Sequence, residues 1–93
     1  MNFASPKSAF TEKQGQYLAF IHAYSLVMGR PPAEADMQRF FAVTPPSVHQ
    51  MVLTLERQGL ISRTPGAARS IQLRIDPETL PKLQPVISSV QRY

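Results

Sequence analysis

The stretch TPPSVHQMVLTLERQGLISR, residues 44–63, decides the fold, because it holds the start, both faces and the end of one helix. Thr44 is a favoured N-cap residue, and Pro45 suits the first helical position, whose N–H has no partner inside the helix. Gly59 is typical of a helix end. Beyond it the apolar spacing changes from about 3.6 residues to about 2, which predicts a strand.

The two sides of this helix differ in chemistry. On a helical wheel one side is apolar and predicts a contact with the core; it carries Val48, Met51, Val52 and Leu55. The opposite side and its flanks carry Pro46, Ser47, His49, Gln50, Leu53, Thr54 and Arg57. A single acid, Glu56, lies nearby in the sequence. Since folding does not require the outward side, it is the candidate functional surface.

Two further helices are predicted upstream. Thr11 and Gln14 have the spacing of a capping box, so the first helix starts there, and Gly29 ends it. Its apolar stripe consists of Tyr17, Ile21, Tyr24 and Met28, flanked by Leu18 and Phe20. After the RPP link, residues 30–32, a short second helix reaches about Phe41.

A β-hairpin is predicted downstream of the glycine. Leu60–Arg63 and Ile71–Ile75 alternate apolar and polar residues, and the connector Thr64–Ser70 is rich in turn residues. Between Arg57 and Ile75 the chain has four arginines, at 57, 63, 69 and 74, and no acid. We therefore expect the hairpin to carry a basic tip.

The chain of 93 residues is the size of one domain. We assign residues 10–75 to a mainly α fold with a small antiparallel β-hairpin, a three-helix winged helix-turn-helix. Residues 1–9 show no apolar period and are expected to form a flexible tail. Residues 76–93 contain three prolines, which disfavour a long helix, and the sequence leaves open whether this tail packs on the domain, joins two copies or is loose.

Composition narrows the function. The net charge is +4, with ten Lys and Arg against six Asp and Glu, which fits a polyanionic partner. With no cysteine and two histidines, we expect no metal site and no cofactor. No catalytic constellation appears, so we expect neither an enzyme nor a small-molecule substrate. No apolar run reaches the roughly 18 residues of a membrane span and no leader is recognisable, so we expect a cytoplasmic protein that does not bind membranes.

The segments FTEKQGQYLAFIHAYSLVMGRPP, TPPSVHQMVLTLERQGLI and PGAARSIQL together resemble the N-terminal DNA-binding domain of the LexA repressor family. The resemblance extends from about Phe10 to Leu73 and keeps the G-x-P-P link, the [ST]-P helix start, the glycine exit and the G-A-x-R motif in order. It implies a winged helix-turn-helix that binds DNA. The family's second domain, a Ser-Lys protease that also holds its dimer together, lies outside the resemblance, so we expect no self-cleavage.

Carried over by position, the recognition helix of the family corresponds to Thr44–Gln58. Its base-reading positions then fall on Pro46, Ser47, His49 and Gln50. This chain departs from the usual family residues, because a proline replaces an amide at 46 and His49 and Gln50 replace a pair of acids. Phe41 stands where the family has its turn glycine. The resemblance therefore implies DNA binding but not the usual operator.

These observations predict sequence-specific binding of double-stranded DNA by a small repressor-like transcriptional regulator. Gln50 is the leading candidate for base reading, since a glutamine amide pairs with an adenine edge, and Leu53 can touch a thymine methyl group. The predicted contacts to the DNA backbone are Thr44, Thr54, Arg57, Arg63 and Arg69. A single module buries little surface, so a homodimer on a two-fold site is expected.

A second interpretation stays open. Winged helices also serve as protein-docking or dimerisation modules, and a fold does not by itself assign a function. In that case Leu53 is a dimer contact or a lone exposed leucine, Arg57 complements the negative end of its own helix, and Arg74 is a solvated strand residue. The acid-free basic segment and the polar outward face favour DNA binding.

Overall fold

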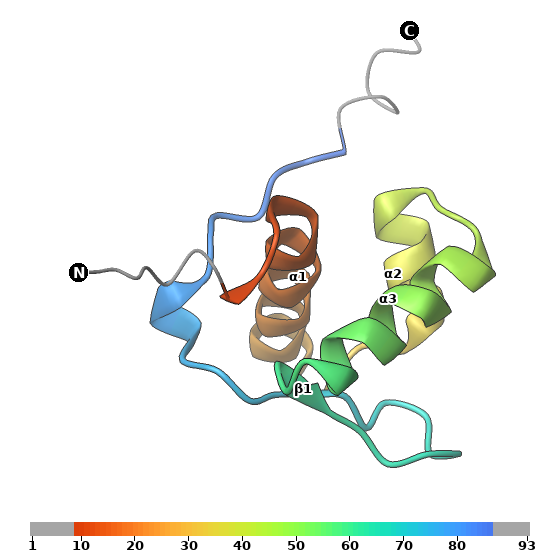
Figure 1. The fold of residues 1–93 in the computed structure, drawn as a ribbon. Helices are drawn as coiled ribbons and strands as arrows, with labels where there is room; N and C mark the ends of the chain where they lie inside the picture. Colours follow the sequence, from red (N-terminus) through yellow and green to blue (C-terminus); the bar gives the residue numbers. More distant parts are fainter. Residues whose placement is uncertain (1–8, 87–93) are drawn as a thin grey trace, which may run out of the picture.

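The structure is a computed structural model that describes residues 9–86, so the predictions for residues 1–8 and 87–93 lie outside it. The described part contains α1 (Glu12–Met28), α2 (Glu34–Phe41), α3 (Pro45–Arg57), β1 (Ile61–Ser62), β2 (Gln72–Leu73) and the 3-10 turn η2 (Pro77–Thr79). α1 and α3 lie beside each other, α2 lies behind α3, and the hairpin runs beneath them (Figure 1). The predicted mainly α, winged helix-turn-helix fold is confirmed. No helix in this part is long and apolar enough to span a membrane.

The helix boundaries follow the predicted capping signals. The Thr11 hydroxyl accepts the Gln14 N–H at 3.1 Å, and the Gln14 side chain accepts the Thr11 N–H at 2.9 Å, so the capping box is complete. α1 ends at Gly29, whose φ of 72° is the left-handed conformation that glycine adopts most easily. α3 follows Thr44, whose hydroxyl accepts the Ser47 N–H at 3.3 Å.

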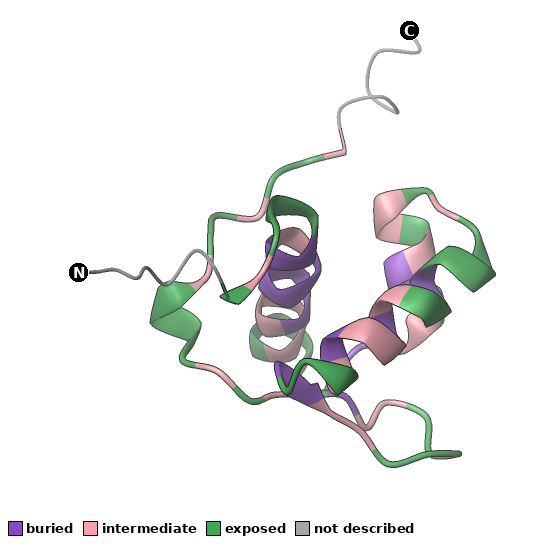
Figure 2. Ribbon diagram, in the orientation of Figure 1, coloured by how far each residue is buried: buried purple, intermediate pink, exposed green. Residues whose placement is uncertain are grey.

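The core lies between α1, the α2–α3 pair and β1 (Figure 2). The predicted inner side of α3 is confirmed, because Val48, Val52 and Leu55 are fully buried and Met51 packs against them. They join Leu18 of α1 in one apolar cluster. Burying one such side chain contributes about 1.5 to 3 kcal/mol, so this side of α3 is committed to folding. Only the opposite side is left for function.

The predicted apolar stripe on α1 is wrong at its C-terminal end. Tyr17 is buried and Tyr24 is partly buried, but half of Met28 is exposed. Leu26 and Val27, which are 71% and 81% exposed, lie beside it in the last turn. Helical spacing does not show where the neighbouring elements stop, and here the packing ends before the helix does.

The left-handed residue of the turn between α2 and α3 is Ala42, which directly follows Phe41, the position that the resemblance aligns with the family's turn glycine. Ala42 has a φ of 56°, in the left-handed region, and its N–H donates to the Gln38 carbonyl. Phe41 is the last residue of α2 and stacks on Tyr17 with the ring centroids 4.1 Å apart. A left-handed alanine costs about 1 to 2 kcal/mol, and the aromatic stack between α1 and α2 helps to offset it.

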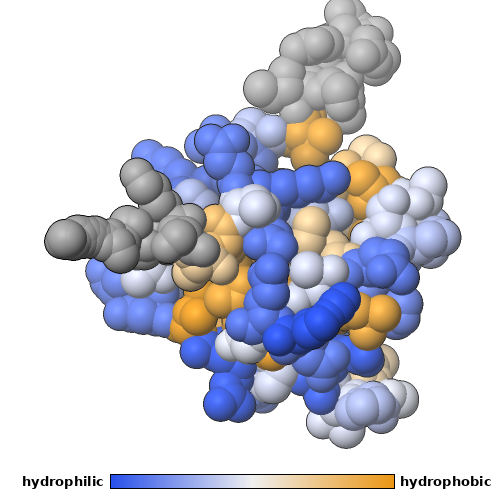
Figure 3. Space-filling view, in the orientation of Figure 1, coloured by the Kyte–Doolittle hydropathy of each residue, from blue (hydrophilic) through white to orange (hydrophobic). Residues whose placement is uncertain are grey.

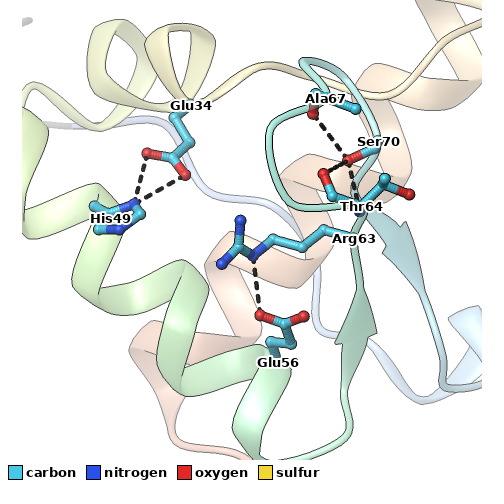
Figure 4. Close-up of polar contacts among 7 residues, drawn as sticks. All are labelled: Glu34, His49, Glu56, Arg63, Thr64, Ala67 and Ser70. Atoms are coloured by element: carbon cyan, nitrogen blue, oxygen red, sulfur yellow. Dashed lines mark hydrogen bonds and ion pairs between the residues drawn. The ribbon is translucent and has the colours of Figure 1, made fainter.

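The hairpin is confirmed, but its strands are shorter than predicted. β1 and β2 pair antiparallel, with Ile61 opposite Leu73. The connector closes on itself through Ser70, whose hydroxyl accepts the Thr64 N–H at 2.9 Å and contacts the carbonyl oxygens of Thr64 and Ala67 at 3.2 and 3.0 Å (Figure 4). These bonds satisfy backbone groups that a longer ladder would otherwise use.

Part of the C-terminal segment packs on the domain. The Gln16 side chain of α1 donates to the Lys82 carbonyl at 2.9 Å and accepts the Gln84 N–H at 2.7 Å. Leu80 and Leu83 of the same segment pack against the core. Of the alternatives left open for the tail, packing on the domain is therefore the one seen in its described portion.

Candidate nucleic-acid interface

The outward side of α3 presents the predicted base-reading residues to solvent. Pro46, Ser47, His49 and Gln50 are all exposed, while Val48 between them is buried. Buried positions repeat every three or four residues along a helix, so the positions between them face outward. We call this outward side, with Pro46, Ser47, His49 and Gln50 in its N-terminal half, the front of α3. Figure 2 shows exposed positions along it.

The front of α3 is most open in its N-terminal half. Thr44 at the N-cap is exposed, and its hydroxyl donates to the Ser47 hydroxyl at 3.0 Å. Leu53 and Thr54, farther along the helix, are half-buried, so Leu53 is not a lone exposed leucine. A recognition helix contacts base edges with its N-terminal residues, and the observed exposure fits that docking.

His49 is held from the side by Glu34, the first residue of α2. The His49 Nδ1 lies 3.2 and 3.3 Å from the two carboxylate oxygens of Glu34 (Figure 4). Half of the His49 side chain and about a third of the Glu34 side chain remain exposed. Sequence reasoning missed Glu34, because the two residues are 15 positions apart on different helices and no periodic pattern links them.

Arg63, a predicted backbone contact, is paired within the domain. Its Nε donates to Glu56 Oε1 at 2.9 Å, and 20% of its side chain is exposed (Figure 4). Because residues 57–75 contain no acid, the sequence predicts that Arg63 has no carboxylate partner. Glu56 lies just before that segment, in the last turn of α3, and the fold brings it back against the hairpin.

Arg69, another predicted backbone contact, lies against α1 and α2. Its Nη1 is within hydrogen-bond distance of three acceptors: the Tyr24 hydroxyl at 3.0 Å, the Asp36 Oδ2 at 3.1 Å and the Pro31 carbonyl at 3.3 Å. Its backbone φ is 56°. The structure therefore places this arginine in an intramolecular network that ties the hairpin to both helices.

Asp36 is the buried centre of this network. It also accepts the Ala33 N–H at 2.8 Å and pairs with Arg39 at 2.7 Å. Burial by itself would raise the pKa of Asp36, but the Ala33 hydrogen bond and the nearby Arg69 and Arg39 hold this pKa below its ordinary value. The hydrogen bond to Tyr24 and the Asp36 carboxylate raise the pKa of Arg69. Asp36 and Arg69, which we call the hairpin anchor, are therefore both charged at neutral pH.

Arg57 differs from the two hairpin arginines. It is exposed at the end of α3, and its side chain makes no hydrogen bond or ion pair with the described residues 9–86. Among the arginines predicted to contact the backbone, Arg57 can therefore meet a phosphate without opening an internal ion pair.

The comparisons with known proteins agree with this geometry. Residues 7–70 match the family model of the LexA DNA binding domain. The chain belongs to the LexA DNA-binding domain family. This confirms the resemblance that the sequence motifs carry.

Three LexA repressors illustrate the similarity. The chain is 40% identical over 70 residues to that of Thermosipho africanus, which covers 75% of this chain and 35% of the relative. For Thermosipho melanesiensis the identity is 41% over 63 residues, covering 68% and 32%. For Bartonella quintana it is 34% over 71 residues, covering 75% and 30%. The chain spans about a third of the length of these LexA repressors.

A hollow of about 470 Å³ lies beside the front of α3 in this LexA-type domain. Its lining comes from two helices and consists of Lys13, Gln14, Pro46, Ser47, Gln50, Met51 and Thr54. The exposed Lys13 brings a cation next to hydroxyl and amide groups, a combination that bonds phosphate oxygens. Sequence reasoning missed Lys13, because the capping box around it reports where α1 begins and not which helix lies beside it.

Proposed function

We propose that this chain binds double-stranded DNA sequence-specifically and acts as a small, non-catalytic, repressor-like regulator of transcription. α3 enters the major groove, and the hairpin lies along the neighbouring backbone. The observation that carries the proposal is the front of α3, where four outward residues in its N-terminal half are exposed and none is acidic. Membership of the LexA DNA-binding domain family supports the same function.

In this proposal Gln50 is the main base reader. Its amide donates and accepts at once, so it can make paired hydrogen bonds with N6 and N7 of adenine. Ser47 and His49 each make a single hydrogen bond to a base edge, and Pro46 makes apolar contact in the groove. Because these residues differ from the usual family residues, the preferred operator also differs.

Backbone contacts set the position of the helix on the duplex. The proposed contacts are Thr44, Thr54, Arg57 and, from α1, Lys13. Arg63 and Arg69 also contact phosphates in this proposal, but each lies beside a carboxylate, Glu56 or Asp36, that offsets part of its charge. The surface that α3 and the hairpin share in Figure 3 is mostly hydrophilic, with small separate hydrophobic patches, which suits a polar DNA interface.

We also propose a homodimer on a two-fold site, in the cytoplasm with the DNA. One module buries too little surface for tight specific binding, whereas two copies read half-sites about 34 Å apart. Sedimentation on duplexes that carry one or two half-sites measures the number of bound copies. Two copies that bind cooperatively support the dimer, and independent binding of single copies argues against it.

Selection of bound sequences from a random duplex pool tests the function, followed by titration of the best site at several salt concentrations. We expect one enriched sequence, and an affinity whose logarithm falls with log salt by about 0.9 per phosphate contacted. A protein-docking module, the second interpretation, enriches no sequence and shows no salt-dependent retention on duplex DNA. That outcome would overturn the proposal.

A further inference from the structure

We infer that Glu34 fixes the proton of His49 on Nδ1, so that Nε2 becomes an acceptor that reads an exocyclic amino group, N6 of adenine or N4 of cytosine, in the major groove. The inference rests on the proposed function, because it names what His49 recognises once α3 lies in the groove. It makes Glu34 a positioning residue for sequence specificity, although Glu34 belongs to α2.

The argument starts from the ring nitrogen that faces α2. Both carboxylate oxygens of Glu34 lie within 3.3 Å of the His49 Nδ1 (Figure 4). An ionised carboxylate accepts hydrogen bonds and donates none, so the nitrogen that faces it carries the proton. A neutral imidazole has one N–H, and its other nitrogen, Nε2, is then left with a lone pair.

The exposed part of the ring determines what His49 offers to DNA. Half of the side chain is exposed, and His49 lies on the flank of the outward side of α3 that faces α2, next to Gln50 and away from Ser47. In the major groove the amino groups of adenine and cytosine are donors, whereas N7 and O6 of guanine are acceptors. An acceptor at Nε2 pairs with the first kind of group and repels the second. The neutral imidazole has two possible tautomers. By fixing one of them, Glu34 makes the exposed Nε2 an acceptor and not a donor.

The position of Glu34 is itself fixed by the fold. Glu34 begins α2, where the helix end favours a carboxylate. Glu34 and Arg63 also line one hollow between α2 and the hairpin. The acceptor is therefore brought opposite His49 by the packing of α2 against α3.

The tautomer is tested without DNA. Long-range ¹⁵N–¹H correlation spectra at about pH 8.5, above the ordinary imidazole pKa of about 6.5, distinguish a proton on Nδ1 from one on Nε2. We expect His49 to carry its proton on Nδ1 in the wild type and to shift toward the Nε2 form in Glu34→Ala, whereas Glu34→Gln keeps an amide oxygen that can accept the same N–H. The spectrum of His22, on α1, serves as the reference and should stay the same. A wild-type His49 protonated on Nε2 overturns the inference.

The base preference is tested by sequence selection with the wild type, both Glu34 variants and His49→Ala. We expect one position at which the pair that places an amino group beside His49, A·T or C·G in one orientation, is enriched about threefold to tenfold over the reversed pair, the effect of one hydrogen bond. Glu34→Ala and His49→Ala should lose this preference, and the enriched pair, A·T or C·G, tells adenine from cytosine. Glu34→Ala should change nothing further in the His49→Ala protein, because Glu34 acts through His49.

The position read by Gln50 controls for folding, since its preference should survive in every variant. Two outcomes overturn the inference and leave DNA binding standing: no base-pair preference at the position that His49 faces in the wild type, or a Glu34→Ala variant that keeps a preference lost in His49→Ala. If the wild type enriches no sequence at all, the proposed function itself fails, while the spectra still report the tautomer.

Discussion

The front of α3 and the β-hairpin share one predicted partner, DNA, but hold their polar side chains differently. On α3, Ser47 and Gln50 are exposed, and the contact of His49 with Glu34 leaves half of the histidine side chain open. On the hairpin, the side chains of Arg63 and Arg69 are 20% and 32% exposed, and each guanidinium contacts a carboxylate. One region offers exposed hydrogen-bonding groups, and the other offers cations already matched within the domain.

This difference shows that the net charge of a sequence segment does not give the uncompensated charge that the folded surface presents to DNA. Arg63 and Arg69 are paired with Glu56 and Asp36, which come from helices before the acid-free segment. A carboxylate beside an arginine offsets part of its charge, which lowers the contribution of that cation to salt-dependent affinity. The hairpin is therefore better suited to hold a fixed shape beside DNA than to supply the main attraction.

The largest expected effect tests whether the hairpin network is structural. Asp36→Ala removes the carboxylate shared by Arg69, Arg39 and the Ala33 N–H. Because partly buried donors lose their partner, we expect the free energy of unfolding to fall by about 2 to 3 kcal/mol, measured by urea denaturation. As a control, Glu78→Ala removes an exposed acid and should change it by less than about 0.5 kcal/mol. Equally small losses would show that the network does not stabilise the domain.

The next largest effect tests whether Gln50 on the front of α3 reads a base. Gln50→Ala should cost about 1 to 3 kcal/mol of affinity for the selected site, because two hydrogen bonds to one base are lost. Affinity for a scrambled duplex and the unfolding free energy should stay nearly unchanged, since the side chain is exposed. Fluorescence anisotropy with both duplexes measures this. Gln58→Ala, an exposed amide beyond α3, is the matched control, and an equal loss on both duplexes for Gln50→Ala would contradict base reading.

A smaller effect compares arginines across the two regions. Arg57→Ala should flatten the dependence of log affinity on log salt by about 0.9, the effect of one phosphate contact. Arg63→Ala should flatten it by less, because Glu56 already compensates that charge. Titration of one non-sequence-specific duplex at several salt concentrations measures both slopes.

Glu56→Gln is the converse variant for this comparison. It leaves Arg63 without its carboxylate partner, so the slope should become steeper and affinity for every sequence should rise about twofold to fivefold, the typical strength of an exposed ion pair. A larger loss of slope in Arg63→Ala than in Arg57→Ala would reverse the comparison.

The smallest effect concerns pH and the hairpin anchor. The pKa of Asp36 is below its ordinary value in the folded protein, so its contribution to stability is present above about pH 4 and is lost as the pH falls through the folded pKa. We expect the wild type to be more stable than Asp36→Asn at neutral pH, and this difference to shrink between about pH 5 and pH 2. Thermal unfolding across this range measures it, and a constant difference would mean that Asp36 does not stabilise the domain through its charge.

The sequence predicted the features that depend on neighbours in the chain. The caps at Thr11, Gly29 and Thr44 are formed within a few residues, and the structure confirms all three. The buried side of α3 follows from helical spacing alone, as the full burial of Val48 and Val52 shows. Such signals report on one element at a time, and this is why they were correct.

The sequence failed where an answer depends on which elements meet. Met28 fits the apolar stripe of α1, but within residues 9–86 its side chain stays half exposed. The left-handed turn residue is Ala42, and Phe41 before it stacks on Tyr17; no pattern within one segment predicts either feature. Periodicity within a segment contains no information about either contact.

The sequence by itself therefore determined that this chain forms a helix with one buried and one outward side, followed by a hairpin. Only the tertiary structure decided which polar groups on these elements remain available. It set His49 beside Glu34, 15 positions away, and Arg69 beside Tyr24, 45 positions away. The physical reason is that an ion pair or hydrogen bond depends on distance in space, which the packing of α2 against α3 and of the hairpin against α1 sets.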